Sequence, residues 1–394
     1  MKEQIILGLG NNIDYEIEWD SGVFENMITR YDIRDHELST AIDVTSERNL
    51  VISILGFLKS ENGGERFVSS PDIIEQFAGN FEKRITLGGT SVRAAIAMRK
   101  LGFTSALHLV TINDDVRRLI PQDSPYVCSN TKESSYPHLI IQFCKAVKVK
   151  AGDINICTSR ENRIIYDNDY DNIVMELNED FADLITDAKV FLISGFNAMQ
   201  SRELLDLRLR TLLKIMEKIP RDALVFYEDA CFYNAGFSKH VHAALVSHIN
   251  VYSLNEDELQ HYIGRKIDLL DASQIKEALE DFHKLVPVPL IVVHSLYWAL
   301  AYGDNAKTLT AALIGGTAMA TTRFRFGDDF TVENYRETVN LAPNEKGAVF
   351  AGAIEALLGS KICCIPVVRV PETKVTTIGL GDSFVGGFLP ALLN

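Results

Sequence analysis

Near the C-terminus lies Thr376-Thr377-Ile378-Gly379-Leu380-Gly381-Asp382-Ser383-Phe384-Val385-Gly386-Gly387-Phe388, the stretch from which the fold of this 394-residue chain is best inferred. A β-branched run from Val375 to Ile378 precedes two glycines and an aspartate, and an apolar-periodic segment then continues to Leu393. This pattern predicts a strand, a glycine turn and the start of a helix. Glycines at a helix N-terminus bring backbone N–H groups close to a bound anion, so the stretch indicates an anion site.

Asp382 has two interpretations at this stage. A carboxylate in the first turn of a helix is favoured by capping and by the helix dipole, so Asp382 fits an ordinary N-cap. A carboxylate beside an anion site is also what phosphoryl transfer to a hydroxyl requires, because it accepts the alcohol proton while N–H donors hold the developing charge. The rest of the chain has to decide between them.

The composition is that of a soluble globular protein, with 47% hydrophobic and 23% charged residues, and the length allows one large α/β domain plus a smaller one. A formal charge of −14 and a pI near 5.2 argue against binding a nucleic-acid backbone. No apolar run approaches a membrane span, and the N-terminus leads into a strand-like run instead of a signal peptide, so we expect a cytoplasmic protein without membrane association. The six scattered cysteines lack zinc-site spacing and are expected to be buried thiols.

The N-terminal part contains a buried first strand at 5–10, which ends in Gly-x-Gly. The third glycine of a dinucleotide fingerprint is missing and the following residues alternate as a second strand would, so a Rossmann dehydrogenase is rejected. Asn12 and Asp14 lie two apart at a strand end, so they point the same way and are suited to grip paired hydroxyls, or else they form a plain turn. Gly88-Gly89, followed by Thr90, repeats the pattern of strand, glycines and helix, and predicts either a second backbone cradle or a tight packing junction.

The middle and C-terminal parts differ in pattern. Residues 136–178 alternate as antiparallel strands, whereas strands and helices alternate from Lys189 onward. The predicted fold is therefore α/β, a doubly wound central sheet flanked by helices, with a smaller α+β lid. We expect residues 1–14, 82–130 and 181–394 in the large nucleotide-binding domain, and residues 15–81 and 131–180 in the lid. Glu228, Asn255-Glu256-Asp257-Glu258 and His294 follow core strands, where active-site residues of such sheets lie.

Five motifs occur in order, and together they resemble the ribokinase superfamily, more closely its ADP-dependent sugar kinases, the glucokinases and phosphofructokinases that use ADP as phosphoryl donor. The likeness covers nearly the whole chain. Its fold, as the resemblance implies, is ribokinase-like. The motifs are Asn12-x-Asp14, Gly88-Gly89, Asn162-Arg163, Asn255-x-x-Glu258 and Gly379-x-Gly381-Asp382.

The resemblance implies a role for each matching residue. Asp382 is the base that activates the sugar hydroxyl, Gly379 and Gly381 supply backbone donors, and Arg163 reaches the nucleotide phosphates from the lid. Glu228 and Glu258 organise Mg²⁺ or another divalent cation, although Phe226 stands where the family's His-x-Glu motif has its histidine. The residues expected to bind the sugar are Asn12, Asp14, Glu65, Gly88, Gly89, Thr90 and His138. Those expected to bind the nucleotide are Asn255, Thr377 and Leu380.

The expected activity is transfer of the β-phosphoryl group of ADP to a sugar hydroxyl, which gives AMP and a phosphorylated sugar. Two alternatives stay open: an ATP-dependent ribokinase-like sugar or nucleoside kinase, and a weakened nucleotide-binding homologue without turnover, which the missing histidine motivates. The acceptor is also open. Glu65 suits the hydroxyls of glucose, whereas Lys145, Lys148 and Lys150 suit the phosphate of fructose 6-phosphate or belong to a solvated strand edge. The expected partners are the small-molecule sugar and ADP, and the chain is expected to be a monomer or a small homo-oligomer.

Overall fold

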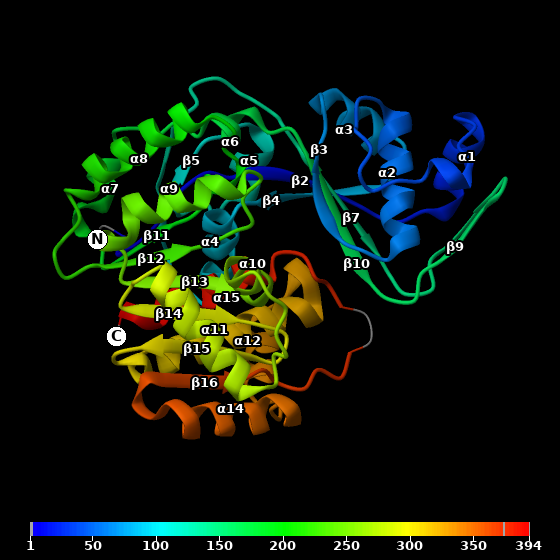
Figure 1. The fold of residues 1–394 in the computed structure, drawn as a ribbon. Coiled ribbons are helices and arrows are strands. Elements are labelled where there is room, and N and C mark those ends of the chain that lie inside the picture. The colour runs from blue at the N-terminus through cyan, green and yellow to red at the C-terminus, as the bar shows by residue number, and fades with distance from the viewer. Residues whose placement is uncertain (1–2, 373–374, 394) are drawn as a thin grey trace.

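A nine-stranded sheet forms the centre of the larger part of the molecule, and a separate five-stranded sheet carries the smaller part (Figure 1). The structure is a computed structural model that describes residues 3–372 and 375–393. The larger sheet has the order β16-β15-β14-β13-β12-β11-β1-β5-β6, in which β14–β15 and β15–β16 pair antiparallel and the others pair parallel. Its strands are β1 (Ile5–Leu7), β5 (Ala106–Leu109), β6 (Tyr126–Cys128), β11 (Val190–Ile193), β12 (Leu224–Glu228), β13 (Val251–Asn255), β14 (Leu290–His294), β15 (Trp298–Gly303) and β16 (Ile362–Pro366).

Both faces of the large sheet are covered, which explains why its parallel strands read as continuous apolar runs. Successive residues of a strand point to opposite faces, so Ile5 and Leu7 join one hydrophobic core while Ile6 joins the other. The first core contains side chains of α4 (Thr90–Lys100), α12 (Thr310–Phe326) and α15 (Leu380–Phe388). The second contains side chains of α8 (Arg202–Met216), α9 (Ala235–Leu245), α10 (Glu256–Ile263), α11 (Ala272–Leu285) and α14 (Glu345–Leu358).

The smaller sheet has the order β3-β10-β7-β2-β4 and forms the lid lobe with helices α1 to α3 (Figure 1). A two-stranded hairpin, β8–β9, extends from it. The strands are β2 (Asn12–Ile17), β3 (Gly64–Phe67), β4 (Lys83–Gly88), β7 (His138–Phe143), β8 (Lys148–Ala151), β9 (Ile154–Cys157) and β10 (Asn162–Asp167). The helices are α1 (Ser21–Arg30), α2 (Glu47–Ser60) and α3 (Pro71–Ala78). Shorter helices complete the chain: α5 (Asp114–Leu119), α6 (Tyr170–Val174), α7 (Phe181–Leu184) and α13 (Val332–Val339).

The expected domain boundaries need correction at two strands. The sequence pattern assigns residues 1–14 and 82–130 to the large domain, whereas β2 and β4 pair with each other in the small sheet. The register joins Asn12 to Gly88 and Asp14 to Thr86. Both strands lie where the chain passes between the domains, because β2 follows β1 of the large sheet and β4 precedes α4, which packs against β1 and β5. A strand pattern does not show which sheet its strand joins.

The expected strand from Val375 to Ile378 is wrong. The described residues 375–378 form an irregular segment, in which the carbonyl oxygens of Val375 and Thr377 accept hydrogen bonds from side chains instead of a neighbouring strand. The helix that follows is also shorter than expected, because α15 ends at Phe388 and residues 389–393 form a 3₁₀ turn. The glycine turn and the start of the helix lie where the sequence predicts them.

Candidate active site

One face of the small sheet brings the polar lid residues together. On β2, Ile13 and Tyr15 enter the core, so Asn12 and Asp14 point to the opposite face, toward the large domain. The strand register places His138 beside Asp14 on that face. Arg163 alternates with the buried Ile164 in the same way. Alternation along the strands therefore gathers the predicted lid residues on one surface.

The contacts of Asp382 bear on its two interpretations. Gly379 is the N-cap residue of α15, with φ 62°, and no side chain of the described residues caps this helix. The Asp382 carboxylate instead accepts a hydrogen bond from Oγ1 of Thr90 at 2.8 Å, and its Oδ2 lies 3.7 Å from Nε of Arg93. Because it makes no capping bond, its position is better explained by a role in the cleft than by helix capping.

The second pair of glycines lies against the two residues expected to grip hydroxyls. A Cβ atom on Gly88 would lie 2.2 Å from Nδ2 of Asn12 and 2.7 Å from Oδ2 of Asp14. Asn12 itself donates to Oδ1 of Asp14 at 2.5 Å. Gly88 is therefore needed so that the Asn12–Asp14 pair can occupy this position, and Gly89, with φ 88°, begins α4.

Arg93 is the site residue that the sequence analysis missed. Its buried guanidinium donates from Nη2 to Oδ2 of Asp14 at 2.6 Å and lies 3.4 Å from Oε1 of Glu16. It thus lies between Asp14 and Asp382. Two features of the sequence pointed to Arg93. It follows Thr90 by three residues, so both side chains lie on one face of α4. A cation near a helix N-terminus also opposes the helix dipole, so carboxylates are expected beside it.

Residues 375–378 are held by side chains from both domains. Arg163 donates from Nη1 to the carbonyl oxygen of Thr377 at 3.2 Å, and Gln142 donates from Nε2 to that of Val375 at 3.1 Å. From the large domain, Nε of Arg323 donates to the carbonyl of Ile378 at 2.6 Å. Arg163 therefore lies beside the glycine turn, with further N–H groups left for an anion.

Thr377 and Leu380, both assigned to the nucleotide, flank the glycine turn. The Oγ1 atom of Thr377 is buried without a hydrogen-bond partner among the described residues. Leu380 is the first residue of α15. A buried hydroxyl without a partner costs free energy, so it indicates a place for a polar group of a ligand.

The charges on the lid face shift two pKa values. Burial opposes the charged form of His138, but its hydrogen bond to Asp169 at 3.1 Å and the nearby Asp167 and Asp14 outweigh this and raise its pKa to about 9. Glu65 is open to solvent, yet protein surrounds it on several sides, and this desolvation together with Asp167 raises its pKa. We infer that His138 is a cation at neutral pH, held against Asp169.

The raised pKa of His138 predicts a pH-dependent stability. Its contribution is complete below the unfolded-state pKa of about 6.5 and is lost as the pH rises through about 9. The wild type should lose up to roughly 3 kcal/mol of unfolding free energy over that window relative to His138→Gln, since one pKa unit corresponds to roughly 1.4 kcal/mol. Chemical denaturation at a series of pH values measures this, with His36→Gln as a control at an exposed histidine. An identical pH slope in His138→Gln and the wild type would contradict it.

The expected metal residues lie at the carboxyl ends of core strands. Glu228 ends β12 and is buried; its Oε1 meets Nε2 of His294 at 3.0 Å, whereas Oε2 has no hydrogen-bond partner within the described part of the chain. The imidazole beside Glu228 therefore comes from β14. Phe226, at the position of the motif's histidine, is buried and packs against Phe388.

Asn255 and Glu258 together cap the N-terminus of α10. Asn255 is the N-cap of α10, and the two residues form a capping box, in which Oε2 of Glu258 accepts from the backbone N–H of Asn255 at 2.8 Å. Burial, then the neighbouring Asp229, raises the pKa of Glu258 well above its usual range. A cation nearby would relieve the repulsion between these carboxyl groups, although no three His, Cys, Asp or Glu side chains of residues 3–372 and 375–393 form a preassembled metal site.

The lysines considered for a sugar phosphate lie outside this site. Lys148 and Lys150 are exposed on β8, which pairs with β9 and packs against α1. Lys145 lies in the turn that precedes β8. A solvated strand edge therefore describes Lys148 and Lys150. No helix among the described residues has the length and apolarity of a membrane span.

Comparison with known proteins identifies the family and the fold. The family model described as "ADP-specific Phosphofructokinase/Glucokinase conserved region" matches residues 3–389. A phosphofructokinase from Pyrococcus horikoshii OT3, solved with AMP, is similar in structure, with a TM-score of 0.79 at 17% identity over 100% of this chain and 98% of that one. No curated protein sequence matches significantly.

Two further solved structures share the fold. One is the last common ancestor of ADP-dependent phosphofructokinases from Methanosarcinales, with a TM-score of 0.75 and 14% identity over 100% of this chain and 94% of that one. The other is an ADP-dependent kinase in complex with fructose 6-phosphate and ADPβS, with a TM-score of 0.74, 14% identity and the same coverage. Since the family model spans nearly the whole chain, the protein belongs to the ADP-specific phosphofructokinase/glucokinase family and is an ADP-dependent sugar kinase.

Proposed function

We propose that Asp382 accepts the proton of a sugar hydroxyl as that oxygen attacks the β-phosphorus of ADP. The observation that carries this proposal is the set of contacts of the Asp382 carboxylate, which accepts a hydrogen bond from Thr90 and makes no capping bond. Arg93 lies between this carboxylate and Asp14. Asn12 and Asp14 offer an amide and a carboxylate for neighbouring hydroxyls, and Thr90 fixes the direction of the base. As the P–O bond to AMP breaks, the proton moves from the hydroxyl to Asp382.

The phosphate groups of ADP would lie over the glycine turn. Gly379 and Gly381 leave the backbone N–H groups of the first turn of α15 accessible, and a Cβ on Gly379 would lie 2.8 Å from Nη1 of Arg93. Arg163 contributes a planar guanidinium from the lid, which matches the oxygens of a phosphoryl group. The lid thereby closes over the reacting phosphate and excludes water that would otherwise accept it.

We further propose that Glu228 and Glu258 hold Mg²⁺ or another divalent cation. The unpartnered Oε2 of Glu228 and the raised pKa of Glu258 fit a hard cation, which prefers carboxylate oxygens, phosphate oxygens and water. Such a cation would neutralise charge on the transferred phosphoryl group. Asn255 positions Glu258 through the capping box.

The substitution Glu258→Gln separates the charge of this residue from its capping role, because glutamine also completes a capping box. We expect the magnesium concentration for half-maximal activity to rise roughly tenfold or more, with little change in the melting temperature. A magnesium titration of the initial rate measures this, and Asp257→Asn, at the exposed neighbouring carboxylate, is the matched control. If activity falls while the magnesium requirement stays unchanged, Glu258 has another role.

Glucose and fructose 6-phosphate are the two acceptors to compare. Glu65 faces the cleft beside Arg163 and His138, and its negative charge favours a neutral sugar over a sugar phosphate at that point. The test is a matrix of ADP and ATP against glucose, fructose 6-phosphate and ribose derivatives, with AMP and sugar phosphate measured as products. Turnover with ATP alone would overturn the proposed donor, and ADP binding without AMP formation across all acceptors would indicate a nonenzymatic homologue.

A further inference from the structure

A cavity lies at the junction of the two domains, between β4 and α4, and its lining reaches Ser383 of α15. Its volume is about 470 Å³, within the range of small-molecule sites. The small domain contributes β4 to its wall, and the large domain contributes α4, α5 and the end of α12. We call it the junction cavity. None of the roles proposed above for the sugar, the nucleotide or the metal uses this space.

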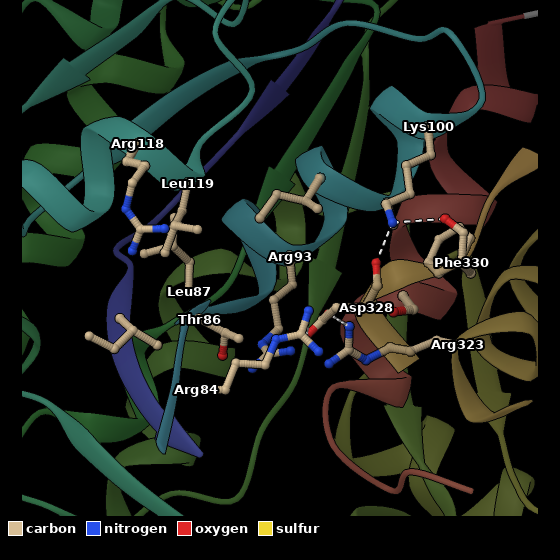
Figure 2. Close-up of a pocket in the computed structure, with 14 residues that line it drawn as sticks. Arg84, Thr86, Leu87, Arg93, Lys100, Arg118, Leu119, Arg323, Asp328 and Phe330 are labelled. Carbon is tan, nitrogen blue, oxygen red and sulfur yellow. Dashed lines mark hydrogen bonds and ion pairs between the residues drawn. The ribbon is translucent and has the colours of Figure 1, made fainter. Parts of the chain in front are cut away.

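The charged side chains that line the junction cavity are mostly basic. Among the described lining residues, five are basic and one, Asp328, is acidic. Figure 2 shows Arg84, Arg93 and Arg323 gathered near Asp328, with Arg118 at the other end of the group and Lys100 above. The basic residues are Arg84, Arg93, Lys100, Arg118 and Arg323.

Three of these cations are weakly paired. Arg84 and Arg118 are 48% and 60% exposed, and they form surface ion pairs with Asp329 at 3.0 Å and Asp115 at 2.7 Å. Arg84 also lies 4.0 Å from Oδ2 of Asp328. Such pairs contribute little, because water and salt screen them. Lys100 donates to the carbonyl oxygens of Asp328 and Phe330 and lies over the Phe330 ring at 4.2 Å, and burial lowers its pKa. An anion can therefore replace these partners at small cost.

The remaining wall is apolar, which narrows the class of ligand. Leu87, Ile96, Leu119 and Phe330 line the cavity between the basic groups. Arginine guanidinium groups match the oxygens of a phosphate in pairs, while the apolar wall favours a carbon body attached to it. We propose that the junction cavity binds an organic phosphate, a phosphate monoester with a small apolar body, between Arg84 of the small domain and Arg118 and Lys100 of the large domain.

Binding there would be linked to the catalytic cleft through Arg93. This one guanidinium lines the cavity and also binds Asp14 and approaches Asp382. A phosphate that attracts Arg93 competes with both carboxylates for it. The ligand also bridges β4 and α5, and so ties the small domain to the large one. The residues that line the junction cavity are the same whichever sugar the enzyme phosphorylates. Binding of an organic phosphate there therefore does not depend on the identity of the sugar.

Calorimetric titration of the full chain with phenyl phosphate, without sugar or ADP, tests the proposal. We expect binding to the wild type and a loss of affinity of at least about tenfold in the double variant Arg84→Gln/Arg118→Gln, because two charge-assisted contacts are removed. Arg117→Gln is the matched control: Arg117 is adjacent to Arg118 on α5 but pairs with Asp114 and Glu133, and it does not line the cavity. Inorganic phosphate should bind more weakly than phenyl phosphate.

Three results would overturn the proposal. The first is no binding of phenyl phosphate to the wild type. The second is equal affinity in the wild type and the double variant, with Lys100→Met, a second variant of the lining, equally unaffected. The third is a loss of binding in Arg163→Gln alone, which would place the phosphate in the catalytic cleft. Unchanged melting temperatures of the double variant and of Lys100→Met show that the loss is local.

Discussion

Asp382→Asn should lower kcat by at least about 10²-fold, the usual contribution of a positioned general base, while the melting temperature and ADP binding stay nearly unchanged. Asparagine keeps the shape of the side chain and can still accept a hydrogen bond from Thr90, but it cannot take the proton of the sugar hydroxyl. Since Asp382 makes no capping bond, the substitution removes no capping hydrogen bond from α15 and costs only the modest dipole interaction of a first-turn carboxylate. The measurement is kcat and thermal midpoint on one preparation.

The control for this result is Asp72→Asn, which changes a carboxylate in the first turn of α3 in the small domain. It should leave kcat unaltered. Turnover of Asp382→Asn close to that of the wild type would refute the mechanism, because no other described carboxylate is bound to Thr90 beside the glycine turn. Thr90→Val offers a graded check: it keeps the base but removes its orienting hydroxyl, and so should reduce kcat less.

Arg163→Ala should lower kcat by about 10²-fold, the effect of removing one preorganised donor from a developing charge. Arg163→Lys should restore only part of this loss, because an ammonium group cannot form the paired contacts of a guanidinium. ADP affinity should change less than kcat in both variants. Steady-state kinetics and a separate ADP titration distinguish the two quantities.

Arg160→Lys is the control for Arg163, since Arg160 is exposed in the same domain and binds the backbone oxygen of Glu61 instead of the cleft. It should behave as the wild type. An unchanged kcat in Arg163→Lys would show that the paired geometry of the guanidinium does not contribute. A loss confined to ADP affinity would assign Arg163 to ground-state binding instead of phosphoryl transfer.

Much of the fold could be predicted because its signals are local. The alternation around Asp14 and Arg163 gives both the strand and the face on which these side chains lie, and the glycines before α15 mark a turn. The segment 375–378 was different. Its β-branched residues have strand propensity, but its carbonyl oxygens bind Gln142, Arg163 and Arg323, which lie more than 50 positions away in the chain. Tertiary contacts therefore overrode propensity.

The same distinction explains why Arg93 was missed and why the contact between His294 and Glu228 was not predicted. Asp14, Gly88 and Asp382 belong to short motifs whose spacing is visible in the sequence. Arg93 acts through Asp14, 79 positions away, and His294 meets Glu228 across 66 positions. Such pairings depend on how strands and helices are placed side by side, and a single sequence gives no distance between them.

The contact between Gln142 and residues 375–376 has a consequence for how such sequences vary. Nε2 of Gln142 donates to the carbonyl oxygen of Val375, and its Oε1 accepts from Oγ1 of Thr376 at 3.3 Å, so a single amide uses both ends across the cleft. An apolar residue at 142 would leave both groups without their protein partner. Homologues that change position 142 should therefore change position 376 as well, so that the pair varies together although 234 residues separate its members.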